Sequence, residues 1–232
     1  MAQITPTVDL VEALVNLITV NEPIKELTDN GDGTYTINVC DVHYARPLCP
    51  ITIGGVDYPV TEISGQDITF TASSAPVGST FTLPAPFYFH GTPTATGAEL
   101  ASIQSHENKF PMVYLHEILR DRTPAEVDAG IQRESDVRIF FLDQANFEDW
   151  DTDQTYSDAI NPMRNLCEAF LNIVKDNSGI APLESDYDIF SYAKFGIRRN
   201  VNGVETNLFS EMLSGVELQI TIPFKKSFVC NC

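Results

Sequence analysis

The sequence predicts an α+β protein in which an antiparallel or mixed sheet packs against helices, with a small all-β domain inserted. Three observations predict this class. Apolar residues with helical spacing open the chain and return in its second half, short strands separated by turn residues fill residues 22–96, and longer apolar strands follow. The order favours an α+β domain of residues 1–21 and 97–232, interrupted by the β-rich domain.

The chain is strongly acidic. Its 232 residues include 14 Lys and Arg against 32 Asp and Glu, which gives a formal net charge of -18. Such a charge repels phosphate backbones and anionic membranes, so nucleic-acid readers and membrane-surface proteins are disfavoured. No run approaches the roughly 20 apolar residues that span a bilayer, and Met1–Asp9 lacks the parts of a signal peptide. We expect folding in the cytosol, with the five cysteines as thiols and no structural disulfide.

An amphipathic helix is expected from Val8 to Val20. Its apolar residues recur every three or four positions, and Thr7 stands where a helix cap is expected. One helix therefore opens the chain.

The β-rich region 22–96 is predicted to be a small barrel or sandwich. Its first turn, Asn30–Gly33, precedes the strand Thr34–Val39, and the aromatic run Phe87–His90 closes the region as part of its core. Residues Gly91–Thr96 have the composition of a linker. Further strands are expected at Pro50–Ile53, Val56–Ile63, Asp67–Ala72 and Thr80–Leu83.

The second half of the chain alternates helices and strands. A helix of roughly ten residues is expected after Gly97, until Phe110-Pro111 ends it. The apolar strand Asp136–Leu142 is predicted to be buried and central in the sheet. The remaining expected elements are the strand Met112–Ile118, the helix Ile160–Val174, and the strands Tyr187–Ile197 and Val216–Phe224.

An acidic cluster follows the central strand. Asp149, Asp151 and Asp153 match the first three ligand positions of a calcium-binding EF-hand loop. The match then fails, because Gln154 stands where the loop needs Gly and Ile160 where it needs the closing Glu. The Asp-x-Asp pair of some glycosyltransferases, here Asp151 and Asp153, is a weaker match still, since no Gly-rich phosphate loop accompanies it. A solvated acidic loop is the favoured interpretation, and the three aspartates remain weak metal candidates.

Other candidate chemistry also has a simpler explanation. Glu217 and Gln219 are similar to the Glu-x-Lys pair of metal-dependent nucleases, but the lysine is missing, and polar alternation on a half-buried strand explains both residues. Cys167 lies in an apolar helical pattern typical of a buried, inert thiol. Cys230 and Cys232 are one residue apart and need two more ligands to hold a metal, so an ordinary tail is favoured. The sequence thus predicts neither an enzyme nor a cofactor.

Four segments carry a resemblance to a known family: Phe110–Leu115, Val137–Leu142, Met163–Leu166 and Leu213–Phe224. Together with the first helix, these segments resemble the tail-terminator and neck (head-tail connection) proteins of tailed bacteriophages. The resemblance lies in the order of the expected helices and strands and in their general residue pattern. The resemblance implies a non-enzymatic virion subunit, assembled in the host cytoplasm, that forms a ring, commonly a homohexamer. Its partners would be the tail tube and the connector or portal, with DNA only passing through the lumen. The β-rich insertion departs from the minimal form of that family.

The end of the chain is the predicted interaction segment. Phe224, Lys225, Lys226 and Phe228 combine two lysines with two aromatic rings on an acidic protein, which suits docking onto an acidic neighbour; a frayed terminus is the alternative. Two other functions stay open. One is a host-surface or carbohydrate-binding module that uses the β-rich region, and the other is a metal-dependent enzyme that uses the aspartates described above.

Overall fold

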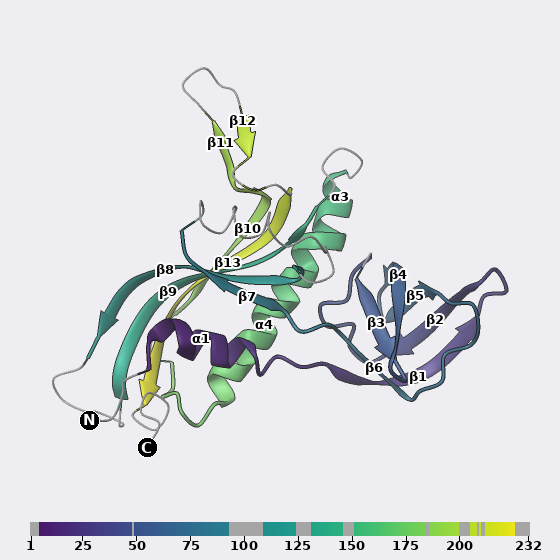
Figure 1. The fold of residues 1–232 in the computed structure, drawn as a ribbon, viewed down its shortest axis with the longest axis horizontal. Helices are drawn as coiled ribbons and strands as arrows, with labels where there is room; N and C mark the ends of the chain where they lie inside the picture. The colour runs from purple at the N-terminus through teal and green to yellow at the C-terminus, as the bar shows by residue number, and fades with distance from the viewer. Residues whose placement is uncertain are drawn as a thin grey trace. The chain divides into compact units, whose positions relative to one another are not determined.

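The chain divides into two compact units, each with its own sheet and core. One unit comprises Met1–Ile18 with Pro86–Cys232, and the other comprises Thr19–Ala85. The architecture belongs to the α+β class (Figure 1). This computed structural model describes residues 5–47, 49–92, 109–123, 131–145, 151–183, 186–199, 205–207, 209 and 212–225. The helix expected after Gly97 lies outside these residues.

The unit Thr19–Ala85 is a closed antiparallel barrel. Its strands follow the order β1-β2-β5-β4-β3-β6, and β6 pairs with β1 to close it. The bounds are β1 Asn21–Asp29, β2 Thr34–Val39, β3 Pro50–Ile53, β4 Val56–Ser64, β5 Asp67–Thr71 and β6 Thr80–Thr82. Alternate residues fill its core, including Ile37, Ile51, Val60, Ile68, Phe70 and Phe81. Strands β2 to β6 are confirmed within a residue or two.

The other unit is built on a five-stranded mixed sheet of order β10-β13-β9-β8-β7. The bounds are β7 Phe87–His90, β8 Met112–Arg122, β9 Ile131–Gln144, β10 Asp188–Phe195 and β13 Leu213–Lys225. The expectation that β9 is central is confirmed. Placing Phe87–His90 in the core of the barrel was wrong, because β7 pairs in parallel with β8.

The helices lie on one face of this sheet. They are α1 Thr7–Val15, the short α3 Thr152–Thr155, the π-helical turn η2 Tyr156–Ile160 and α4 Asn161–Asp176. Ser135 and Phe141 share a face of β9, and they contact Thr7 of α1 and Phe170 of α4 respectively. Thr7 is not the predicted cap, because Pro6 occupies the N-cap and the Thr7 hydroxyl donates to Asp121. Helix α1 also ends at Val15, earlier than expected.

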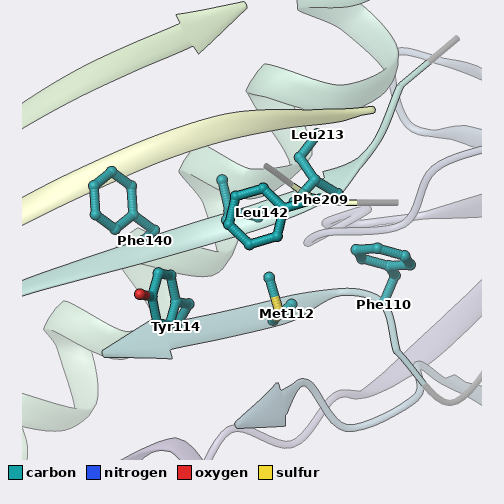
Figure 2. Close-up of a cluster of buried hydrophobic side chains, with 7 residues drawn as sticks. All are labelled: Phe110, Met112, Tyr114, Phe140, Leu142, Phe209 and Leu213. Atoms are coloured by element: carbon teal, nitrogen blue, oxygen red, sulfur yellow. The ribbon is translucent and has the colours of Figure 1, made fainter. Parts of the chain in front are cut away.

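The opposite face carries an aromatic cluster (Figure 2). Side chains from β8, β9 and β13 meet there, and Phe209 packs against them. Its buried members are Phe110, Met112, Tyr114, Phe140, Leu142, Phe209 and Leu213. A separate two-stranded antiparallel sheet is formed by β11 Ile197–Arg199 and β12 Glu205–Asn207. Among the described residues, no helix is long and apolar enough to cross a bilayer.

Candidate interaction site

A pocket of about 820 Å³ lies at the C-terminal end of α4. Its wall includes Lys175 from the last turn of α4, Tyr187 from just before β10, and Lys225 from the end of β13. Ile180, Pro182 and Leu183, from the loop after α4, add apolar surface. The pocket thus offers two ammonium groups and an apolar surface to an occupant, and Asp176 and Asp186 balance the charge of the lysines.

Backbone hydrogen bonds fix this loop to the end of β13. The Ala181 N–H donates to the carbonyl of Pro223 at 2.9 Å, and the Lys225 N–H donates to the carbonyl of Gly179 at 2.8 Å. Inside the loop, the Asn177 side chain accepts from the Gly179 N–H at 2.8 Å. These bonds hold Lys225 beside the end of α4, although 49 positions separate it from Asp176 in the sequence.

The two lysines carry the charge of the pocket. Lys175 Nζ donates to the Tyr187 hydroxyl at 3.3 Å and lies 5.2 Å from the centre of its ring. Lys225 Nζ donates to the carbonyl of Ser178 at 3.0 Å. Asp176 and Asp186 also line the pocket, but within the described part of the chain neither ammonium forms an ion pair. Both ammonium groups keep donors for an incoming carboxylate.

The structure divides the predicted interaction segment. Lys225 lines the pocket, whereas Phe224 is fully buried, with 0% of its surface exposed. Strand alternation explains the difference, because it turns Phe224 toward the core and Lys225 away from it. Phe224 therefore stabilises the strand and offers no surface for docking. Lys226 and Phe228 lie outside the described residues.

The other half of this site was not predictable from the sequence. Lys175 is an ordinary last-turn residue of an amphipathic helix, and Tyr187 opens a predicted strand. No local pattern brings either of them to Lys225, because their proximity depends on non-local pairing at the end of β13. A lysine in the last helical turn was the only available signal.

The aspartates of the acidic cluster have different environments. Asp151 is the N-cap of α3, where it accepts from the Gln154 N–H at 2.8 Å, while the Gln154 side chain accepts from the Asp151 N–H. Asp153 is exposed, and Asp149 lies outside the described residues. Within those residues, no group of three or more His, Cys, Asp or Glu side chains is placed to hold a metal ion.

The cysteines that the structure describes are free thiols. They are Cys40, Cys49 and Cys167. Burial raises the pKa of the Cys167 thiol to about 12, so it is protonated and unreactive at neutral pH. Cys230 and Cys232 lie outside the described residues, so their candidate metal site stays a prediction.

Glu217 lies on the aromatic face of the sheet, with 1% of its side chain exposed. Arg138 Nε donates to one of its oxygens at 2.7 Å, the Tyr192 hydroxyl to the other at 2.6 Å, and Gln219 donates at 2.6 Å. Burial opposes ionisation, but the three hydrogen bonds outweigh it and lower the pKa of Glu217. The carboxylate is therefore ionised at neutral pH and has an evident structural role.

Arginine–carboxylate pairs continue across the same face. Arg120 pairs with Asp136 at 2.8 Å, and Thr221 donates to the same carboxylate at 2.7 Å. Arg122 pairs with Glu134 one step along the strands. These arginines thus form ion pairs with carboxylates, whereas Lys175 and Lys225 form hydrogen bonds to uncharged groups.

In the described part of the chain, Lys175 and Lys225 meet in the pocket at the end of α4, and both form hydrogen bonds but no ion pair. No protein-family model, no curated protein and no solved structure matches this chain. Its own surfaces and charges are therefore the basis for a functional proposal.

Proposed function

We propose that this chain is a non-enzymatic virion subunit of a tailed bacteriophage that assembles into a ring at the tail end or neck. The observation that carries the proposal is the pocket, which presents Lys175 and Lys225 on a protein with a net charge of -18. The two lysines can bind carboxylates of a partner, while Asp176 and Asp186 in the same wall can bind cations, and every further copy of the chain carries groups of both kinds.

The pocket favours a contact with a different surface of the next copy over a contact between two pockets. Two copies joined pocket to pocket would bring lysines against lysines, and like charges in contact are costly. A contact between the pocket and a different surface of the next copy avoids this cost. When such contacts are heterologous, they generate a closed ring if the rotation between copies is right, whereas a reciprocal pair of them makes a two-fold dimer.

The edges of the five-stranded sheet support the same arrangement. Strands β10 and β7 are its two edges, and they differ in sequence, length and direction of pairing. Within the described residues, neither pairs with a further strand on its outer side. Unlike edges suit contacts between different surfaces of adjacent subunits.

The phage assignment comes from the resemblance in element order to tail-terminator and neck proteins. An acidic ring suits this place, because like charge keeps DNA from binding the wall of the lumen as it passes. The tail tube and the connector or portal are the proposed partners. A homohexamer is the proposed stoichiometry.

We also propose that Thr19–Ala85 is an independent all-β domain inserted between α1 and β7. Its closed barrel and its own buried core support this. A closed barrel leaves no open sheet edge, so it does not depend on the rest of the chain to satisfy its backbone.

Mass photometry combined with electron microscopy tests the ring. We expect the purified chain, alone or with tail tubes, to form rings of a single stoichiometry. Raising the ionic strength from about 0.1 M to about 1 M shortens the Debye length from about 10 Å to about 3 Å and should weaken association. A strict monomer that binds glycans on an array would contradict the proposal and establish the host-surface alternative.

A further inference from the structure

We propose that Asn30, in the turn between β1 and β2, is a deamidation site that hydrogen bonds to Asp29, Thr34 and Thr36 protect in the folded chain. The turn lies in the unit Thr19–Ala85, and its chemistry does not depend on the proposed ring. The reaction needs only water as a co-reactant.

The dipeptide Asn30-Gly31 has the composition that this reaction favours. The Gly31 backbone nitrogen loses its proton and attacks the side-chain carbonyl carbon of Asn30, and ammonia leaves from that carbon to give a five-membered succinimide. Water then opens the succinimide at either of its two carbonyls, which gives aspartate or isoaspartate. Glycine has no Cβ to hinder the attack, and both residues are exposed, so burial does not protect them.

The fold keeps the attacking nitrogen in its unreactive form. The Gly31 N–H donates to Oδ1 of Asp29 at 2.8 Å. The reaction requires this nitrogen to become an anion, and a carboxylate at hydrogen-bond distance stabilises the protonated amide and repels the anion. Asp29 therefore opposes the first step of the reaction.

The leaving nitrogen of Asn30 is held as well. Asn30 Nδ2 donates to Thr34 Oγ1 at 2.9 Å and to Thr36 Oγ1 at 3.1 Å. Thr36 is fixed in turn by a hydrogen bond of 3.0 Å to Thr69 on β5. Ammonia can leave only after Nδ2 separates from both hydroxyls, so these bonds also oppose the reaction.

The products do not fit this turn. Aspartate has no N–H to donate to the hydroxyls of Thr34 and Thr36, and it adds a negative charge beside Asp29 and Asp32. Isoaspartate also lengthens the backbone of the turn, which sets the register of β1 against β2. Reaction at Asn30 therefore damages the barrel, and the protecting bonds preserve it.

Peptide mapping by mass spectrometry, during incubation at mildly alkaline pH, tests the protection. We expect Asn30 to deamidate at least on the order of tenfold more slowly in the folded chain than in the chain unfolded in urea. Asn202-Gly203, the other Asn-Gly pair of the sequence, verifies that the conditions in urea support the reaction. Equal rates at Asn30 in the folded and the unfolded chain would overturn the proposal.

Two variants test the individual contacts. D29A removes the acceptor of the Gly31 N–H, and T36V removes one acceptor of the Asn30 amide with little change in shape. We expect D29A to raise the rate at Asn30 on the order of tenfold and T36V to raise it several-fold.

E26A and T28V, on β1, are the matched controls. Both residues are exposed, and within the described part of the chain neither side chain forms a hydrogen bond. Each control should therefore deamidate like the wild type. A D29A variant that reacts no faster than E26A would overturn the role of Asp29, and a slower one would show that its carboxylate acts as the base.

A core variant separates the local contacts from the stability of the barrel. V60A removes buried volume from β4 without touching the turn, and circular dichroism melts compare its stability with that of D29A and T36V. We expect V60A to leave the rate at Asn30 close to that of the wild type. An acceleration by V60A equal to that of D29A would mean that global unfolding controls the reaction and would overturn the proposed contacts.

Discussion

Glu217 is a residue whose environment the sequence predicts only in part. Polar alternation predicts a half-buried residue at this position of the strand, but the side chain is almost fully buried. Its partners Arg138 and Tyr192 come from β9 and β10, which lie far away in the sequence. Because those pairings depend on the register of three strands, no local pattern in the sequence could identify these partners.

Replacing Glu217 by Gln should destabilise the sheet unit in a pH-dependent way. The folded pKa of Glu217 is below its ordinary value, so its charge stabilises the fold above the unfolded pKa of about 4.3. That contribution is lost as the pH falls through the folded pKa. We expect a cost of roughly 1–3 kcal/mol at pH 7 that shrinks below about pH 4.5. Urea unfolding across pH measures it, and a cost independent of pH would contradict the account.

Gly215 is required by the close approach of β13 and β9. Its φ is +154°, and a Cβ there would lie 2.0 Å from the carbonyl oxygen of Phe141. Gly91, in the same unit, has φ +141° but only an ordinary 3.6 Å contact with the Phe89 ring. We therefore expect G215A to cost about 1–3 kcal/mol more than G91A in thermal unfolding. Equal effects of the two variants would show that backbone strain alone matters.

Among the elements, local patterns predicted the strands better than their pairing. Turn residues and alternation located β2 to β6 of the barrel. Strand β1 was not assigned because most of its residues are exposed, which hides the alternation. The parallel partner of β7 is β8, and this non-local pairing overrides the composition of Phe87–His90 that favoured the barrel.

The start of α3 tests whether Asp151 is a helix cap. D151A removes the acceptor of the Gln154 N–H and should cost about 1 kcal/mol of stability, whereas D151N should cost a few tenths. Chemical denaturation compares the two. Calorimetry with Ca²⁺ provides the control, because a metal site would instead show stoichiometric binding that both variants weaken.

For the whole molecule, the sequence predicted the fold class from element order, but not the pocket. The β-rich domain was expected at residues 22–96, and the observed unit is Thr19–Ala85. The two ranges differ mainly where the unit ends, because β7 belongs to the five-stranded sheet and not to the barrel. The pocket draws on α4, β13 and the residues before β10. Only the folded chain brings these segments together.

The two units should unfold separately if the barrel is an inserted domain. F70A in the barrel core and F170A in α4 each remove a fully buried ring, at a cost of roughly 3–5 kcal/mol. We expect each variant to lose hydrogen-exchange protection in its own unit only, as measured by mass spectrometry. Loss of protection in both units from either variant would mean that the chain folds as one cooperative domain.

The central claim is that copies of this chain join head to tail and close into a ring. Native mass spectrometry over increasing protein concentration tests it most directly. Heterologous contacts predict successive additions of one subunit beyond the dimer, ending at one closed stoichiometry. A distribution that stops at the dimer would indicate a two-fold contact and would contradict the account, as would a monomer at every concentration both with and without tail tubes.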